Sequence, residues 1–205
     1  MAESKEASGY VFVGGHLCLD FVNTEVIRNG SPLDLLADFD DLVSWLVEAH
    51  VIDKAESREA LDKWSGKRES KEAFEQALEF RAVLRSLVAR IAKKKSVQQS
   101  ALDAINDLLS NRPGYLQIKR VRGGFETRVQ AETVEPVHLI VPIAMSASEL
   151  LCHADLSRIK MCKNPDCVIF FCDTTKNQAR NWCSMKACGN RMKVAAHYYR
   201  KRSNK

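Results

Sequence analysis

The sequence predicts an α+β protein: a predominantly helical body with a β-hairpin, followed by a small cysteine-rich module at the carboxyl end. Three observations predict this class. Apolar residues recur at helical spacing through most of residues 33–110, alternate at strand spacing over 115–132, and give way to a cysteine cluster after residue 160. With 205 residues, 45% of them hydrophobic, the chain can bury a sizeable core. We expect the body to span residues 1–156 and the module 157–205.

The first part of the chain, residues 10–26, fits more than one type of secondary structure. Residues 10–13 are β-prone and precede Gly14-Gly15, which predicts a turn or a tight backbone approach. Residues 17–26 fit either a strand or a helix. We prefer the helix, on which one face carries the polar residues His16, Asp20, Asn23 and Thr24.

Helices are expected through the middle of the chain. The apolar pattern predicts them over residues 33–50, 54–64, 71–94 and 96–110. Ser70 can cap the third helix at its amino end. The strand-like stretches 115–121 and 125–132 flank Gly123-Gly124, a hairpin signal. Residues 137–155 are the most apolar segment and predict the helix that closes the core.

Charge is distributed unevenly. The net charge is +5, but residues 157–205 hold 12 basic and 2 acidic residues, a local charge of +10, which leaves −5 on residues 1–156. A basic segment on an acidic body predicts a polyanionic partner such as DNA. No uninterrupted apolar run reaches ~18 residues, and the amino end lacks an apolar leader. We therefore expect no membrane span and a cytoplasmic protein.

Four of the seven cysteines form the strongest pattern. Cys162 and Cys167 make one C-x4-C loop, and Cys183 and Cys188 make another after fifteen residues. Two such loops supply the four thiolates that zinc prefers in a closed, structural site. The carboxyl module is therefore predicted to be a four-cysteine zinc finger holding one Zn²⁺. We expect the remaining cysteines, Cys18, Cys152 and Cys172, to be free and buried.

These residues resemble a known family. The motif Cys162-x4-Cys167-Val-Ile-Phe-Phe-x-Asp173-Thr-Thr-Lys-Asn177, with Arg180-Asn-Trp182-Cys183-Ser-Met-Lys-Ala-Cys188-Gly189-Asn190-Arg191, resembles the CGNR zinc finger. The string Leu19-Asp20-Phe21-Val22-Asn23-Thr24 resembles the start of the ABATE domain, which usually precedes that finger. The resemblance implies a bacterial, stress-induced transcription regulator that binds DNA. It departs from the family at Asn181, where a second Arg is more usual, and at Cys172, where an aliphatic residue is usual.

The carboxyl-terminal helix is the predicted DNA contact. On a helix over residues 191–202, one apolar strip carries Met192, Ala195, Ala196 and Tyr199, and cations lie on the opposite side. The alternative is a solubilising terminal helix, and Arg191 could instead brace the finger. The candidate DNA-binding residues are Arg180, Lys186, Arg191, Lys193, His197, Arg200 and Lys201. A single small finger gives weak specificity, so a long operator would imply a homodimer or a partner protein.

The body poses a separate question. Arg81 and Arg85 lie within the apolar stripe of the third predicted helix and need anionic partners unless they reach solvent. Asp20 is the candidate anionic partner inside the protein, with Asn23 and Thr24 adding hydrogen bonds. The other interpretation is a pocket for a small anionic ligand, lined by His16, Asp20, Asn23, Thr24, Arg81 and Arg85.

No catalytic constellation is visible in the sequence, so we name no catalytic residues and expect a non-enzyme. Two other functions stay open. One is a zinc finger that binds proteins and not DNA. The other is an enzyme that uses the region of His16, Asp20, Arg81 and Arg85.

Overall fold

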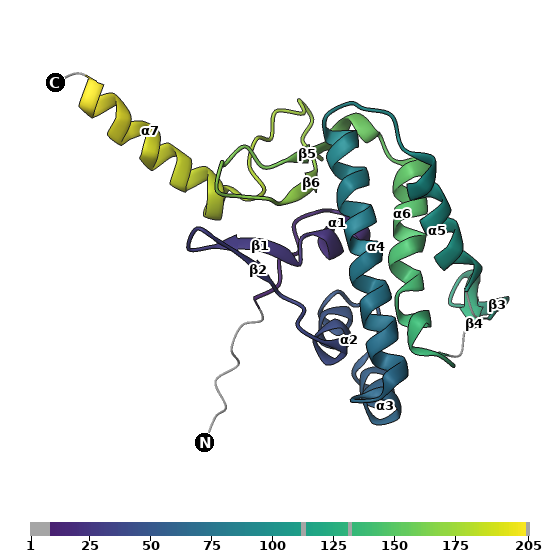
Figure 1. Ribbon diagram of the computed structural model, residues 1–205. Coiled ribbons are helices and arrows are strands. Elements are labelled where there is room, and N and C mark those ends of the chain that lie inside the picture. Colours follow the sequence, from purple (N-terminus) through teal and green to yellow (C-terminus); the bar gives the residue numbers. More distant parts are fainter. Residues whose placement is uncertain (1–8, 112–113, 131–132, 204–205) are drawn as a thin grey trace.

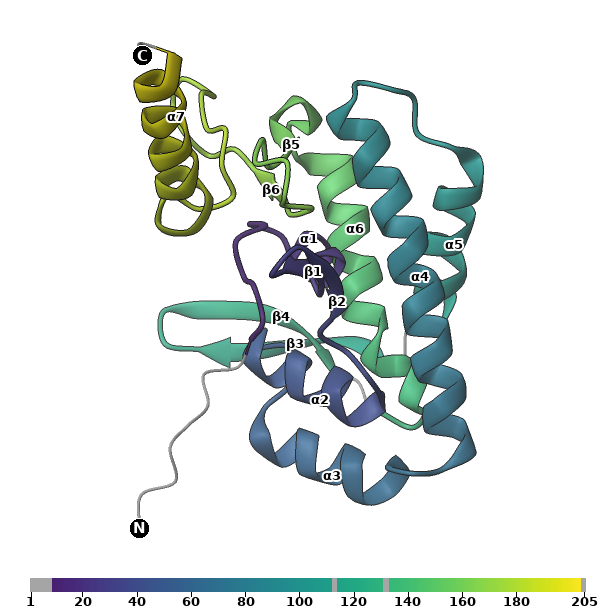
Figure 2. The ribbon, with the colours of Figure 1, turned by 60° about the vertical axis from the view of Figure 1, so that its left-hand side comes forward.

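The fold is α+β, as predicted. The computed structural model describes residues 9–111, 114–130 and 133–203 (Figure 1). The long helix α4 runs the length of the body, with α5 and α6 beside it and α2 and α3 at its amino-terminal end (Figures 1 and 2). The helices are α1 (Leu17–Val22), α2 (Phe39–Glu48), α3 (Lys54–Trp64), α4 (Arg68–Ala92), α5 (Gln99–Ser110), α6 (Val141–His153) and α7 (Asn190–Ser203).

The strands form three separate antiparallel hairpins. The Gly123 turn, with φ at 96°, joins the predicted pair β3–β4. The third pair, β5–β6, belongs to the finger. The bounds are β1 (Glu25–Arg28), β2 (Ser31–Asp34), β3 (Tyr115–Val121), β4 (Gly124–Gln130), β5 (Ile159–Met161) and β6 (Phe170–Cys172).

The body core is formed by the apolar faces of the helices. Its largest fully buried side chains include Phe21, Trp45 and Leu84. By length and composition alone, the segment Pro136–His153 could cross a membrane. This segment contains α6, which packs against α1 and α5. Its residues Ile143 and Ala147 are buried in the core of the body, as in the core helix of a soluble protein.

The largest difference from the sequence prediction lies between residues 25 and 38. A helix was expected from residue 33, but α2 begins at Phe39, and the Asp38 carboxylate caps it by accepting from the Asp41 backbone N–H at 2.9 Å. A β1–β2 hairpin precedes it, turning at Asn29 and Gly30, whose φ angles of 52° and 79° suit a tight two-residue turn. The preferred helix over 17–26 accordingly ends at Val22.

Smaller predictions also fail. Residues 10–13 form no strand, and α4 begins at Arg68, so Ser70 lies inside the helix and its hydroxyl donates to the Lys67 carbonyl at 2.8 Å. Cys152 is exposed at the end of α6, contrary to expectation, because its position falls off the helix's buried face. Cys18 and Cys172 are buried and free, as predicted.

Candidate metal centre

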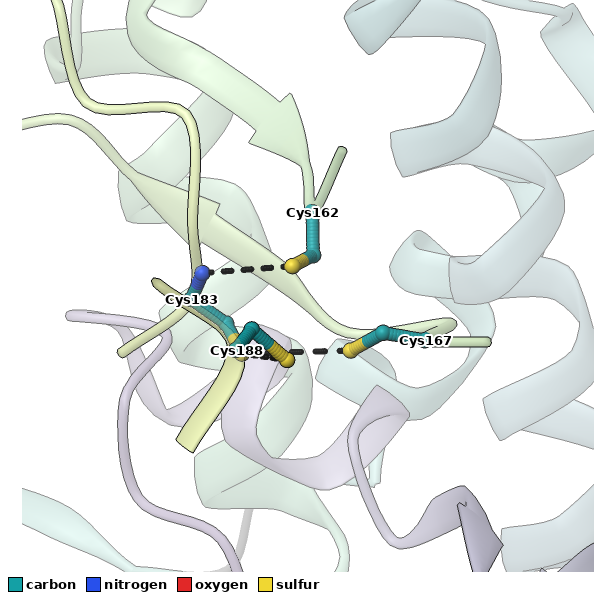
Figure 3. A group of neighbouring side chains, drawn as sticks. All are labelled: Cys162, Cys167, Cys183 and Cys188. Carbon is teal, nitrogen blue, oxygen red and sulfur yellow. Dashed lines mark hydrogen bonds between the residues drawn. The ribbon is translucent and has the colours of Figure 1, made fainter. Parts of the chain in front are cut away.

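Four cysteine sulfurs converge between the two loops of the finger (Figure 3). Cys162 follows β5, and Cys167 lies in the loop before β6. Cys183 precedes the π-helical turn Met185–Gly189, and Cys188 lies within it. All four Sγ atoms lie within 4.8 Å of one another. The Cys167–Cys183 and Cys183–Cys188 Sγ separations are 3.8 Å and 3.6 Å. A zinc ion with Zn–S bonds of about 2.3 Å sets sulfurs about 3.8 Å apart, so the donor set fits zinc.

Neighbouring N–H groups orient the sulfurs. The Cys183 backbone N–H donates to Cys162 Sγ at 3.4 Å, and the Asn164 side-chain amide donates to Cys188 Sγ at 3.3 Å. Asn164 is itself buried and accepts from the Cys167 backbone N–H through its carbonyl at 3.0 Å. Such outer bonds fix the ligand geometry and stabilise thiolate charge.

The sulfurs lie close enough to share protons. A hydrogen bond from the Cys183 thiol lowers the pKa of Cys167 to about 5, and the same contact, with burial, raises the pKa of Cys183. Burial also raises the pKa of Cys162. Zinc replaces these shared protons, so loading the site releases them and is favoured by rising pH.

These observations support one structural zinc ion held by Cys162, Cys167, Cys183 and Cys188. Four protein ligands complete a tetrahedron and leave no coordination position for substrate. When bound, the metal ties the two finger loops together.

The finger is closed on its other side by the body. Its buried cluster joins Ile169 and Phe171 to the cysteines and to Val26 of β1. Further half-buried apolar residues of the body, Val11, Val13 and Leu35, pack against it. The hydrophobic interior of the finger is therefore shared with the amino-terminal segment.

Asn23 bonds the two parts directly. Its buried side-chain amide donates to the Phe170 carbonyl at 2.8 Å and accepts from the Phe170 N–H at 2.8 Å, as a neighbouring strand would. Alongside it, the Cys172 N–H donates to the Gly14 carbonyl at 2.8 Å. We call these contacts of Asn23 and Gly14 the socket. Asn23 was predicted as a pocket residue, and the structure gives it this bridging position instead.

The two core arginines bond carboxylates that the sequence prediction missed, and Arg81 also bonds Thr24, which the prediction named. Arg81, only 3% exposed, makes a two-pronged bond to the Asp34 carboxylate, contacts Thr24 Oγ1 at 2.7 Å, and lies 3.6 Å from Glu25. Arg85 bonds Glu25 at 3.2 Å. Although burial opposes it, the bond from Arg81 lowers the pKa of Asp34.

The predicted anion pocket is therefore closed by the protein's own carboxylates. Asp20 is not the partner of the arginines, because its carboxylate accepts from the Gly14 N–H at 2.7 Å. His16 lies elsewhere, at a hollow beside α6. Asp34 was missed because residues 33–50 carried a helical pattern that hid the β2 strand.

Arg180, a candidate DNA-binding residue, braces the finger. Its Nε donates to the Trp182 carbonyl at 3.0 Å, its terminal nitrogen bonds the Cys183 carbonyl, and its guanidinium lies 4.2 Å from the centre of the Phe171 ring. These bonds leave the side chain half-buried.

Asp173 anchors the same loop, a role the sequence signalled only as an Asp-Thr-Thr turn. It is fully buried and accepts from Lys160 Nζ at 2.7 Å and from the Arg180 N–H at 2.9 Å. Burial would raise its pKa, but the bonds from Lys160 and Thr175 hold the pKa far below its usual range.

The basic helix α7 extends away from both the finger and the body (Figures 1 and 2). Lys186, Arg191, Lys193 and Lys201 are exposed, while the side chains of His197 and Arg200 lie outside the described part. Val194 is 55% exposed and Ala196 is exposed, whereas Met192 and Ala195 are half-buried. The described part of the predicted apolar strip is thus only partly covered, and the side chain of Tyr199 lies outside the described part.

Fold and site together define a zinc-finger protein with a helical body. Residues 158–201 match the model of the CGNR zinc finger, and residues 15–154 match that of the ABATE domain, described as a "Putative stress-induced transcription regulator". The chain therefore belongs to the ABATE family. A search of curated proteins gave no match.

Proposed function

We propose that this protein is a bacterial, cytoplasmic transcription regulator whose zinc finger presents α7 to DNA. The observation that carries the proposal is the exposure of Arg191, Lys193 and Lys201 on α7, a helix that extends away from the body (Figure 1). An α-helix fits the major groove of B-DNA, and basic side chains along it neutralise phosphates. The family description points in the same direction.

The charge distribution supports this orientation. The finger and α7 carry +10, and one of their two acids, Asp173, is buried against Lys160. The body carries −5 and would be repelled by DNA. An approaching duplex is therefore drawn to the finger end of the molecule.

The region of Arg81 and Arg85, which was considered as an enzyme site, is more consistent with a binding protein than with an enzyme. Arg81 and Arg85 are committed to Asp34 and Glu25, so they do not present free guanidinium groups to a substrate. We propose a non-enzymatic regulator, acting as a homodimer where the operator is long.

A salt titration of the full, zinc-loaded chain tests DNA binding. Each neutralised phosphate contributes about −0.9 to the slope of log K against log salt. We expect the Lys193→Ala/Lys201→Ala variant to lose about 2 from that slope while keeping its zinc. The matched control removes two exposed lysines of the body, Lys54→Ala/Lys71→Ala, and should leave the slope unchanged.

Equal slopes for wild type and the α7 variant would contradict the proposal. The second candidate, a finger that binds proteins, would then lead. It is favoured by the exposed apolar side chains Val194 and Met185 beside the cations, at 55% and 51% exposure.

A further inference from the structure

A cavity of about 420 Å³ opens at the junction of the body and the finger. It lies between the carboxyl end of α4 and strand β5, which are neighbours in both ribbon views (Figures 1 and 2). We propose that this cavity binds a small amphipathic anion: a carboxylate or phosphate group attached to a flat apolar body. We call it the junction pocket.

The floor of the junction pocket is apolar. Ala89 and Ala92 supply it from α4, and Phe170, only 2% exposed, supplies it from β6. Met161 of β5 lines one side and remains 47% exposed. These side chains give the cavity an apolar wall that the apolar part of a ligand can cover, and the volume is in the range of small-molecule sites.

The rim is positively charged. Lys93, at the end of α4, and Lys163, in the first cysteine loop, both line the pocket and are exposed. No carboxylate is among the described residues that line it. Neither lysine ammonium group has an ion-pair partner within the described ranges.

Two further cations line the junction pocket and differ from Lys93 and Lys163 in having partners within the protein. Lys160 is neutralised by Asp173, and Arg180 bonds finger carbonyls, so both are used by the fold. Lys93 and Lys163 are not used in this way. An anion placed between them would gain two charge-assisted hydrogen bonds while its apolar part covers the floor.

The position gives the ligand a regulatory consequence. Lys93 belongs to the body and Lys163 to the finger, so one bound anion would bond both sides of the junction. It would add a connection to those already made by the Asn23 and Gly14 bonds of the socket and by the Arg85 bond to the Val168 carbonyl. The site is separate from α7, and its occupancy can be measured without DNA.

The test uses 2-naphthoate as the probe, measured by calorimetry on the zinc-loaded full chain. 2-Naphthamide lacks the charge and acetate lacks the apolar body. We expect 2-naphthoate to bind at least tenfold more tightly than either, and to raise the melting temperature. The Lys93→Glu/Lys163→Glu variant should bind it at least tenfold more weakly.

The matched control is Lys95→Glu/Lys176→Glu, which makes the same charge change at exposed lysines outside the pocket and should bind as wild type. Unchanged zinc content and circular dichroism show that each variant is folded. Equal binding of 2-naphthoate and 2-naphthamide, or equal weakening in both double variants, overturns the proposal. A third outcome would also overturn it: 2-naphthoate does not bind, and Lys93→Glu/Lys163→Glu alone loses DNA affinity. These lysines would then be assigned to contacts with DNA phosphates.

Discussion

The helical body and the finger are stabilised in different ways. The body buries a broad apolar cluster drawn mainly from helices α1 to α6, in which side chains such as Trp45 and Leu87 are fully enclosed. Ile159, Phe170 and Cys172 of the finger strands join this cluster. The buried cluster of the finger contains Ile169, Phe171, the four cysteines and Val26 of the body. Burial of apolar side chains stabilises the body, whereas the finger depends on zinc and on packing against apolar residues of the body.

This difference shows where the molecule is vulnerable. Removing the metal should disorder the finger and leave the body folded, because the body cluster contains none of the zinc ligands. Removing the body would expose to solvent the apolar side chains of the finger that pack against it. Experiments on the finger therefore need the full chain.

The largest expected effect is loss of the metal. Cys188→Ser should reduce zinc content from one per chain to none and unfold the finger, since structural zinc contributes about 10 kcal/mol or more to such modules. Metal analysis and the near-ultraviolet signal of Trp182 would report it. The control Cys172→Ala should keep its zinc, because Cys172 lies outside the sulfur cluster. Loss of metal from Cys172→Ala alone would show that the ligand set is wrong.

The next effect concerns the body. Asp34→Ala should lower the free energy of unfolding of the body by about 3 kcal/mol. Arg81 would stay buried with the neutral Thr24 hydroxyl and a more distant carboxylate, Glu25 at 3.6 Å. Because the pKa of Asp34 is lowered in the fold, this contribution is present at neutral pH and disappears as the pH falls through that pKa. Chemical denaturation measures it. The exposed Glu75→Ala is the control, and equal stabilities of the two variants would contradict the ion-pair account.

Asn23→Ala should affect the junction between body and finger. It leaves the buried Phe170 N–H and carbonyl without partners, which costs about 2 kcal/mol. Hydrogen exchange at the Phe170 amide should accelerate, while amides inside α4 keep their protection. The control Asn106→Ala changes an exposed asparagine of α5. Unchanged exchange at Phe170 would mean that the socket does not hold the finger.

The smallest effect is a pH dependence at the base of the socket. Burial raises the pKa of Asp20 to about 6, despite backbone bonds from Gly14 and Val13 that lower it. The raised pKa means that the fold disfavours the ionised carboxylate, so its protonated form stabilises the fold as the pH falls. Relative to Asp20→Asn, wild type should gain about 1 kcal/mol between pH 7 and pH 5. A difference that is constant across this interval would contradict the assignment.

The sequence alone predicted the zinc ligands and most of the helices. Cys162, Cys167, Cys183 and Cys188 lie in two short loops, and short loops set their own geometry. The apolar period placed α3, α5, α6 and the β3–β4 hairpin within a few residues, because helical and strand spacing is a local property.

Tertiary structure decided which groups meet across the chain. Asp34 pairs with Arg81 across 47 residues, and Asn23 bonds Phe170 across 147. Such pairings depend on the packing of whole elements, which no local period encodes, and the β1–β2 hairpin that positions Asp34 was itself hidden by a helical pattern. The sequence thus determined a zinc finger and a helical body, while only the packed structure decided that they share one interior and a junction pocket.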